Sequence, residues 1–542
     1  MLDKTKRGWW KSAVLYQIYP KSFQDTNGDG VGDIPGIIQR LDYLEKLGID
    51  GIWLSPVYDS PQVDNGYDIS DYRDIWPAFG TLADMEELIR EAKKRGIVII
   101  MDLVLNHSSD KHFWFQEALK GRDNPYHDYY IWQDGTPDAP PNDLKAAFGG
   151  SAWTYIPSLG QYYFHQFAVE QPDLNWENPA MRQELYDMIR FWVDKGIGGF
   201  RLDVIDHIGK QPMCGITKNG PRLHEFVKEL SREAFCEEGL VTVGEAWGAD
   251  LAQAKQYSAP DGSELSMIFQ FEHINLDRAS GSGQWGSAPF SLKALKQCIE
   301  RWQHELYNQG WNSLFWNNHD LPRIVSRWGN DGTWRVESAK MLATLLHGMQ
   351  GTPYIYQGEE LGMTNAYHLT PDTYVDLAAI NDYKHQLSLG RSEAEALAYL
   401  HAWSRDNART PMQWSAEENS GFSTGKPWLP VNPNYLQINA KAALADPDSV
   451  FYHYQRLIDL RMRYPVFRDG TFTLLEPDSE QLFVYTRNTE REHLLVVCNF
   501  TGEMLTYQRP AAFENARLLL SNYGAPVERL RPYEGQIFYY EK

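Results

Sequence analysis

The sequence predicts an α/β fold: a (β/α)8 TIM barrel with an inserted small domain after strand 3 and a C-terminal antiparallel β-sandwich domain. Three observations lead to this prediction. Short apolar runs alternate with amphipathic helical patterns until eight such runs can be counted, as expected for a parallel sheet closed into a barrel. The alternation is interrupted across residues 107–175. From about residue 471 it gives way to period-two runs divided by turns.

The eight predicted strands are short apolar runs, most of them closed by polar residues, and helical patterns lie between several of them. Residue 81 is Thr and residue 84 is Asp, a pair that predicts an N-cap for the second helix. Strands that alternate with helices pair in parallel, so the runs belong to one sheet. The strands are predicted at residues 13–19, 49–57, 97–105, 198–205, 240–246, 267–271, 314–316 and 352–356, and the helices at 37–47, 82–94, 180–195, 223–235, 292–306 and 338–346.

These patterns divide the chain into four parts. Residues 1–106 and 176–470 form the barrel, and residues 107–175 form an inserted domain far longer than a usual βα loop. Residues 471–542 form the C-terminal β domain. Its strands are predicted at residues 482–487, 493–500, 517–521 and 537–541.

Composition excludes several classes of function. A net charge of −21 without a long basic run argues against nucleic-acid binding, which depends on clustered Lys and Arg. No apolar run is long enough to span a membrane and no secretory signal is present, so we expect a cytoplasmic protein, and a monomer. The four Cys have no metal-binding spacing, and no zinc-protease, P-loop or dinucleotide motif is present.

Charged residues follow four of the predicted strands. Arg201 and Asp203 alternate along one strand and therefore point to the same face, where an unpaired charge costs several kcal/mol. A structural ion pair would explain this segment alone. However, residues 102–107, 244–247 and 317–320 place further carboxyl groups and His at three other strand ends. A barrel gathers such ends around one cavity, and two carboxylates flanking a bond are the equipment for glycosidic cleavage.

These four segments, in this order, resemble the four sequence regions of the α-amylase superfamily, glycoside hydrolase family 13. The resemblance extends over the whole chain. Within the family it is strongest to oligo-1,6-glucosidases and bacterial dextran glucosidases, to which residues 171–175 and 404–414 also correspond. The resemblance implies a retaining exo-α-1,6-glucosidase that removes glucose from isomalto-oligosaccharides, and from dextran, through a covalent glucosyl-enzyme.

The resemblance implies roles for three carboxylates. Asp203 corresponds to the nucleophile, Glu245 to the general acid/base, and Asp320 to the carboxylate that binds the substrate hydroxyls and stabilises the transition state. Arg201 on the same strand face would keep Asp203 ionised. Glu245 lies beside Ala and Trp, and apolar neighbours raise a carboxyl pKa toward that of a proton donor.

The resemblance also implies a pocket for the terminal glucose. Asp64 and Tyr67 would close it, with Asp64 paired to Arg409, so that the enzyme acts from the non-reducing end. His107 and His319 would hydrogen-bond the sugar. The residues identified as substrate-binding are Asp64, Tyr67, His107, Phe148, Gln171, Arg201, Val204, Trp247, His319 and Arg409.

Two residues bear on linkage and chain length. Val204 resembles the residue of α-1,6-acting members, but a methyl group discriminates by only about 1–3 kcal/mol, which predicts preference and not exclusivity. Trp247 resembles the dextran glucosidases, where it would stack on the next sugar. The alternative is a Trp that only packs the rim.

Residues 25–33 place oxygen-bearing side chains at alternating positions with Gly between them, much like the first part of an EF-hand loop. The resemblance implies a structural Ca²⁺ here. Its ligands would be the side chains of Asp25, Asn27, Asp29 and Asp33 and the carbonyl of Val31. An ordinary Asp/Gly loop is the alternative.

Other activities use the same scaffold: α-1,4-glucosidase, sucrose isomerase or transglucosylase, and trehalose-6-phosphate hydrolase. Residues 321–328 lack the Arg/Asp-rich loop of isomaltulose-type synthases, and no basic cluster near Glu245 is evident that would hold a phosphate. A non-catalytic barrel that only binds a partner is a remote alternative, because such barrels lack the three carboxylates.

Overall fold

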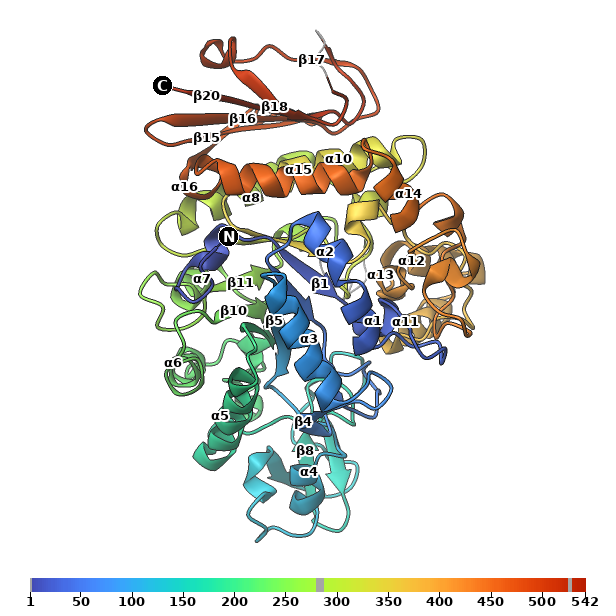
Figure 1. Cartoon of the computed structure of the whole chain (residues 1–542). Helices are drawn as coiled ribbons and strands as arrows, with labels where there is room; N and C mark the ends of the chain where they lie inside the picture. The colour runs from blue at the N-terminus through green and yellow to red at the C-terminus, as the bar shows by residue number, and fades with distance from the viewer. Residues whose placement is uncertain (1, 279–286, 525–528) are drawn as a thin grey trace.

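The computed structural model describes residues 2–278, 287–524 and 529–542, and its centre is a parallel barrel (Figure 1). The strand order is β11-β10-β9-β5-β2-β1-β13-β12. A parallel bridge between Ile268 and Asn312 joins the two ends of this order, so the sheet is closed. The predicted fold is confirmed. The barrel strands are β1 (Leu15–Ile18), β2 (Gly51–Leu54), β5 (Val98–Val104), β9 (Gly199–Asp203), β10 (Val241–Ala246), β11 (Met267–Gln270), β12 (Ser313–Leu314) and β13 (Thr352–Tyr356).

The helices around the barrel follow the predicted pattern with local differences. The capping box of Thr81 and Asp84 starts α3 as predicted. The helix predicted at 37–47 is two helices that meet at Arg40. β12 comprises Ser313 and Leu314 instead of the predicted residues 314–316, because Phe315 and Trp316 already belong to the loop after it. The helices are α1 (Ile34–Gln39), α2 (Leu41–Leu47), α3 (Leu82–Lys94), α5 (Pro179–Asp194), α6 (Leu223–Ala234), α7 (Leu251–Tyr257), α8 (Leu292–Leu306), α9 (Ile324–Arg327) and α10 (Arg335–His347).

Two insertions follow the carboxyl ends of neighbouring strands. After β5 come α4 (Phe113–Ala118) and an antiparallel sheet of β6 (Trp132–Asp134), β8 (Gln161–Phe164) and β7 (Trp153–Ile156), at the bottom of Figure 1. After β2 comes an antiparallel pair that the sequence did not predict, β3 (Tyr58–Asp59) with β4 (Asp71–Ile75). The loop between β3 and β4 carries Asp64 and Tyr67 to the barrel mouth.

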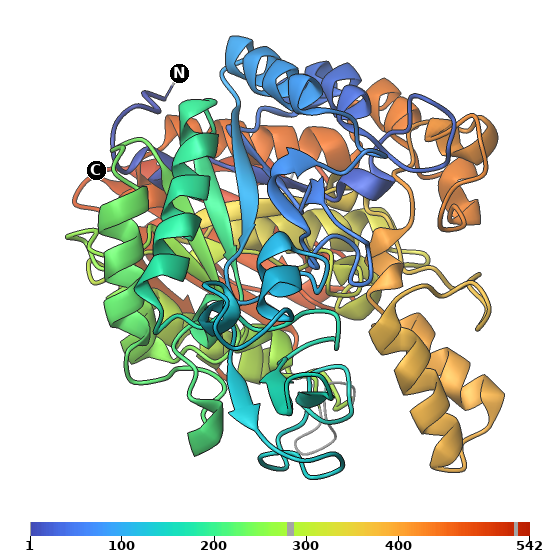
Figure 2. The same ribbon diagram turned by 90° about the horizontal axis from the view of Figure 1, so that it is seen from below.

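A helical hairpin follows β13 and was also not predicted. It consists of α11 (Leu377–Ser388) and α12 (Glu393–Trp403), has its own small apolar core and projects from the body of the molecule (Figure 2). The short α13 (Asp406–Arg409) comes directly after it. The side chain of Asn381 on α11 donates to the carbonyl of Phe148, so the hairpin contacts the insertion after β5.

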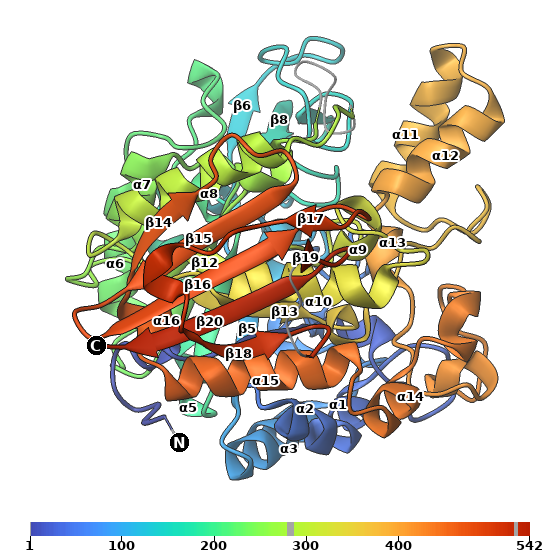
Figure 3. The same cartoon turned by 90° about the horizontal axis from the view of Figure 1, so that it is seen from above.

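The C-terminal β domain lies across α10 and α15 (Val450–Arg463), on the opposite side from the insertion after β5 (Figures 1 and 3). Its antiparallel sheet has the order β14-β15-β16-β20-β18, and the pair β17-β19 covers part of one face. No helix of the described residues is long and apolar enough to cross a membrane. The remaining elements are α14 (Ala440–Ala445), α16 (Val466–Asp469), β14 (Thr471–Leu475), β15 (Leu482–Asn488), β16 (Glu492–Asn499), β17 (Leu505–Thr506), β18 (Arg517–Ser521), β19 (Arg529–Leu530) and β20 (Gly535–Glu541).

Candidate active site

Arg201 on β9 holds three carboxylates at the carboxyl end of the barrel. Its Nη1 donates to Asp203 Oδ1 at 2.7 Å and to Asp102 Oδ1 at 2.8 Å, and its Nη2 lies 2.7 Å from Glu245 Oε2. All four side chains are buried. One guanidinium therefore faces three acidic groups in a region of low dielectric constant, where the charged form of a carboxyl is disfavoured.

Burial raises the pKa of Asp203 well above its ordinary value, and the charges of Glu245 and Asp102 add to this while Arg201 opposes it. Burial also raises the pKa of Glu245, again against Arg201. Arg201 thus lowers the pKa of Asp203, as expected, but the effect of burial is larger and the net pKa is raised. The predicted rise for Glu245 is present, as a proton donor requires.

Val204, directly after β9, has a strained backbone. Its φ of 34° and ψ of 47° lie in the left-handed region, which is unfavourable for a β-branched residue. Its N–H donates to Glu245 Oε2 at 3.1 Å. Such strain persists only where the surroundings impose it, and it concentrates at functional sites. The turn after β9 thus fixes β9 and β10 to each other at Glu245.

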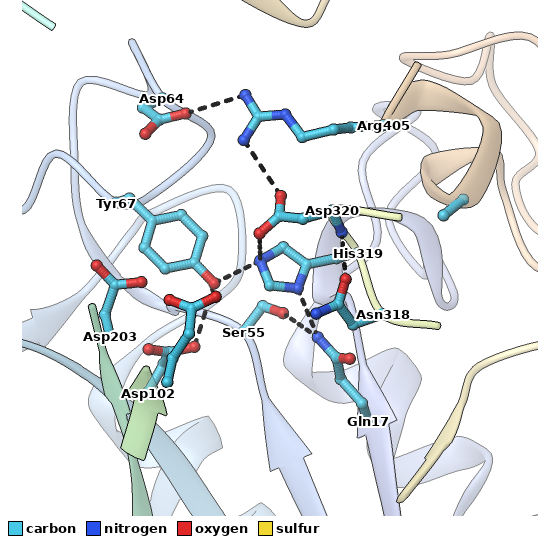
Figure 4. A network of polar contacts seen from close by, with 12 residues as sticks. Gln17, Ser55, Asp64, Tyr67, Asp102, Asp203, Asn318, His319, Asp320 and Arg405 are labelled. Carbon is cyan, nitrogen blue, oxygen red and sulfur yellow. Dashed lines mark hydrogen bonds and ion pairs between the residues drawn. The ribbon is translucent and has the colours of Figure 1, made fainter. Parts of the chain in front are cut away.

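A chain of hydrogen bonds runs through His319, as Figure 4 shows. Gln17 Nε2 lies 2.8 Å from His319 Nδ1, and because the amide donates, the proton of the neutral ring is on Nε2. Burial lowers the pKa of His319 to about 3, so the ring is neutral at pH 7. Its Nε2 lies 2.6 Å from the Tyr67 hydroxyl, which donates to Asp102 Oδ2 at 3.2 Å.

Asp320 has the opposite electrostatic environment from Asp203. Its Oδ1 accepts from Arg405 Nη1 at 3.1 Å, and its Oδ2 lies 3.2 Å from His319 Nε2 (Figure 4). The same Oδ1 accepts from Arg409 Nη2 at 2.7 Å. Burial would raise the pKa of Asp320, but His319 and the two Arg hold it well below its usual range. Asp320 is therefore ionised at neutral pH.

The predicted pair of Asp64 with Arg409 is wrong. Asp64 Oδ1 lies 3.7 Å from Arg405 Nη2, whereas Arg409 donates to Asp320 and to the His319 carbonyl. The two Arg lie one helical turn apart, at the start and end of α13, and Arg405 is the one that reaches the loop between β3 and β4 (Figure 4). Burial raises the pKa of Asp64 to about 7 although Arg405 opposes it.

The structure brings the predicted substrate-binding residues to one pocket at the barrel mouth. Gln171 lies beside the lining, with its Nε2 3.2 Å from Asp64 Oδ2 and 3.2 Å from His107 Nε2. Burial lowers the pKa of His107 to about 4, so it is neutral. Arg201, His319 and Arg409 contact the lining residues. The lining consists of Asp64, Tyr67, His107, Ala147, Phe148, Phe167, Asp203, Val204, Glu245, Trp247, Asp320 and Arg405.

Sequence reasoning missed several residues of the site. Asp102 stood in a strand-end segment that was already recognised, and Arg405 stands four residues before Arg409, so both had a signal. Phe167 had none: its ring lies 5.2 Å from that of His107 and 6.0 Å from that of Phe148, contacts that depend on the fold of the insertion. Gln17 lies at a strand position that periodicity assigns only to the core.

The loop at residues 25–33 is folded by its own side chains. Asp25 Oδ1 accepts from the N–H groups of Asn27 and Gly28, and Asp33 accepts from Gly36 N as the N-cap of α1. The all-oxygen donor set suits a hard cation. Nevertheless, no group of three or more His, Cys, Asp or Glu side chains in the described part of the chain is placed to hold a metal ion. The Ca²⁺ site stays a prediction.

An eight-stranded parallel barrel whose pocket at the carboxyl end is lined by Asp203, Glu245 and Asp320 has the carboxylates that glycosidic cleavage requires. The family described as "Alpha amylase, catalytic domain" matches residues 17–470. The chain therefore belongs to the α-amylase family, glycoside hydrolase family 13.

Three relatives illustrate the similarity. An oligo-1,6-glucosidase of Heyndrickxia coagulans is 52% identical over 98% of this chain and 100% of its own length. A glucan 1,6-alpha-glucosidase of Streptococcus pneumoniae is 55% identical over 91% of this chain and 92% of its own. The crystal structure of trehalose-6-phosphate hydrolase from Bacillus licheniformis has a TM-score of 0.94 and 49% identity, covering 98% of this chain and 100% of that one. Relatives of similar identity thus differ in substrate.

Proposed function

We propose that this protein is a retaining exo-α-1,6-glucosidase that releases glucose from the non-reducing end of isomalto-oligosaccharides and dextran. The observation that carries the exo assignment is the Asp64–Arg405–Asp320 contact across the pocket, with ion-pair distances of 3.7 and 3.1 Å. We infer that these residues close the pocket beyond a single sugar ring, so that a longer chain would extend only toward the open side.

In the proposed mechanism Asp203 attacks the anomeric carbon while Glu245 protonates the leaving oxygen. Glu245 then removes a proton from a water that hydrolyses the glucosyl-enzyme. The single guanidinium that contacts both carboxyls supports the separation of about 5–5.5 Å that retention requires. Asp320, held ionised by two Arg, is suited to bind sugar hydroxyls as an acceptor.

The preference for the α-1,6 linkage is supported by Val204 and by relatives. Val204 lines the pocket immediately beside Asp203 and Glu245, where its methyl groups limit the approach of the leaving sugar. Relatives 52% and 55% identical are named oligo-1,6-glucosidase and glucan 1,6-alpha-glucosidase.

A product time course tests this function. Purified protein is incubated with isomaltose, isomaltotriose, dextran, maltose, sucrose and trehalose 6-phosphate, and the anomer of the first glucose released is followed by NMR. We expect α-glucose from isomaltose and isomaltotriose, with little from maltose. Fast cleavage of maltose and none of isomaltose would overturn the linkage assignment, and initial release of β-glucose would overturn retention.

Trehalose-6-phosphate hydrolase is the second candidate, and one observation favours it. The Arg278 guanidinium carbon lies 5.6 Å from the centre of the Trp247 ring, and no carboxylate of the described residues forms an ion pair with it. The adjacent Asp277 is already bound to Arg327 and Trp328. A cation near the leaving-group side suits an anionic sugar. Release of glucose 6-phosphate in the time course above would establish this candidate.

We also propose that Ca²⁺ binds the loop at residues 25–33 and acts on stability alone. The loop precedes α1, and none of its five predicted ligands lines the pocket. The ion would therefore add no charge to the reacting groups.

A further inference from the structure

Both carboxylate oxygens of Glu245 have hydrogen-bond donors. Oε2 faces Arg201 Nη2 at 2.7 Å and Val204 N at 3.1 Å, both from the segment of β9. Oε1 accepts from the indole Nε1 of Trp247 at 3.1 Å. Because donors from two sides grip the two oxygens, the carboxyl cannot rotate without breaking one of these bonds.

The indole of Trp247 is itself held. Its ring stacks on that of Phe271 with centroids 3.6 Å apart and planes 9° apart. Phe271 is buried and packs edge-on against Phe315, 5.4 Å away. The Arg278 guanidinium lies near the same indole at 5.6 Å, within cation–π range. The indole thus contacts both Phe271 and Arg278, and loss of the Phe271 ring leaves the Arg278 contact and the hydrogen bond to Glu245 in place.

We propose that Trp247 is a positioning residue, whose indole N–H fixes the carboxyl of Glu245 and favours its ionised form. This inference rests on the role of Glu245 proposed above. Glu245 must lose its proton in the first half of the reaction and act as a base in the second. A donor that stabilises the carboxylate makes Glu245 a stronger acid in the first half and a weaker base in the second, so it sets the balance between the two steps.

The electrostatics around Glu245 agree with this role. The charged groups that face it are Arg201 and Asp203 on β9, Asp102 on β5 and Asp320 after β12. Burial raises the pKa of Glu245, and the Trp247 hydrogen bond acts in the opposite direction, together with Arg201 and the Val204 N–H. Removing the N–H leaves the other groups in place, so its effect can be measured separately.

The test is the Trp247→Phe variant, which keeps an aromatic ring for the Phe271 stack but has no N–H. The alkaline limb of the pH profile of kcat/KM reports the acid in the free enzyme. We expect this limb to move up by about one pH unit, because the carboxylate loses a charge-assisted hydrogen bond. An unchanged limb in a folded variant overturns the inference. Trp247→Leu, which also has no side-chain donor, serves the same purpose if Trp247→Phe does not fold.

Phe271→Leu is the matched control. It removes the stacking partner but retains the Trp247 N–H, so we expect a higher KM for isomaltotriose and an alkaline limb within about 0.3 pH units of wild type. An equal shift in both variants would mean that packing and not the hydrogen bond sets the limb, and would overturn the inference. The profile is measured on whichever α-glucoside the wild type cleaves. Failure on isomaltose therefore rejects the linkage assignment and leaves this test intact.

Discussion

The two ends of the barrel both carry a cavity lined by charged residues, but only one has the chemistry of an active site. The amino-end cavity has a volume of about 650 Å³, against about 110 Å³ for the pocket around Asp203. In the larger one Lys4 pairs with Asp50 at 3.3 Å, and Arg95 with Asp42 at 2.7 Å. Arg95 also pairs with Glu45 at 3.7 Å and with Glu91 at 3.3 Å, but Arg95 and all three of its carboxylates are partly exposed to solvent.

At the carboxyl end one Arg201 serves three carboxylates, and the adjacent Val204 has a left-handed backbone. Cavity size therefore does not identify the active site. Unbalanced buried charge and a strained backbone identify it, because both are unfavourable for folding and need another reason to be present.

The largest effect on activity is expected when one carboxylate is neutralised at each end of the barrel. Asp203→Asn removes the proposed nucleophile, so kcat/KM should fall at least about 10³-fold while the melting temperature stays near wild type. Asp50→Asn at the amino end should leave kcat/KM unchanged. Rates are measured with isomaltose, and folding by thermal unfolding. Comparable losses of activity in both variants would contradict the distinction between the two ends.

A smaller effect is expected at Val204. Val204→Ala removes two methyl groups from the pocket wall, so the ratio of kcat/KM for isomaltose to that for maltose should fall about tenfold. The two kcat/KM values are measured on the same preparation. An equal change for both substrates would show that Val204 supports the site without selecting the linkage.

A perturbed pKa alone does not mark a site, and Glu359 can show this. It is buried outside the pocket, accepts from the Tyr454 hydroxyl at 2.7 Å, and burial raises its pKa to about 7. A carboxyl pKa raised on folding stabilises the protein fully below the unfolded pKa, and this contribution is lost as pH rises through about 7. Glu359→Gln should therefore reduce the loss of stability between pH 6 and 8 by about 1 kcal/mol, with little change in kcat.

Urea unfolding at the two pH values measures this difference. In Glu359→Gln the amide oxygen can still accept the hydrogen bond of the Tyr454 hydroxyl, which limits the loss of stability caused by the substitution. A pH dependence equal to that of the wild type would place the responsible group elsewhere.

Ca²⁺ at residues 25–33 is expected to change stability and to leave activity unaffected. Adding Ca²⁺ to metal-stripped protein should raise the melting temperature by a few degrees, since a ligand at 100 times its Kd stabilises the folded state by about 2.7 kcal/mol. The variant Asp29→Asn should abolish this rise, because it removes one of the charged ligands. The Asp29 side chain accepts a local hydrogen bond from the Val31 N–H, which the Asn oxygen can also accept, so the loop should keep its fold. The kcat should not change on addition of the metal. No rise in the wild type would reject the site.

The sequence by itself determined the barrel and the strand-end carboxylates. Apolar periodicity is a local property, and the positions of Arg201, Asp203, Glu245 and Asp320 at the ends of three runs follow once a barrel is assumed. The C-terminal β domain was predicted for the same reason.

Only the tertiary structure decided which groups pair. Arg405 and not Arg409 faces Asp64, Tyr67 meets His319, and Trp247 reaches back to Glu245. The hairpin of α11 and α12 was likewise not predicted, and α13 follows it directly. These contacts join residues from separate elements through side-chain length and direction, which no repeating pattern along the chain encodes.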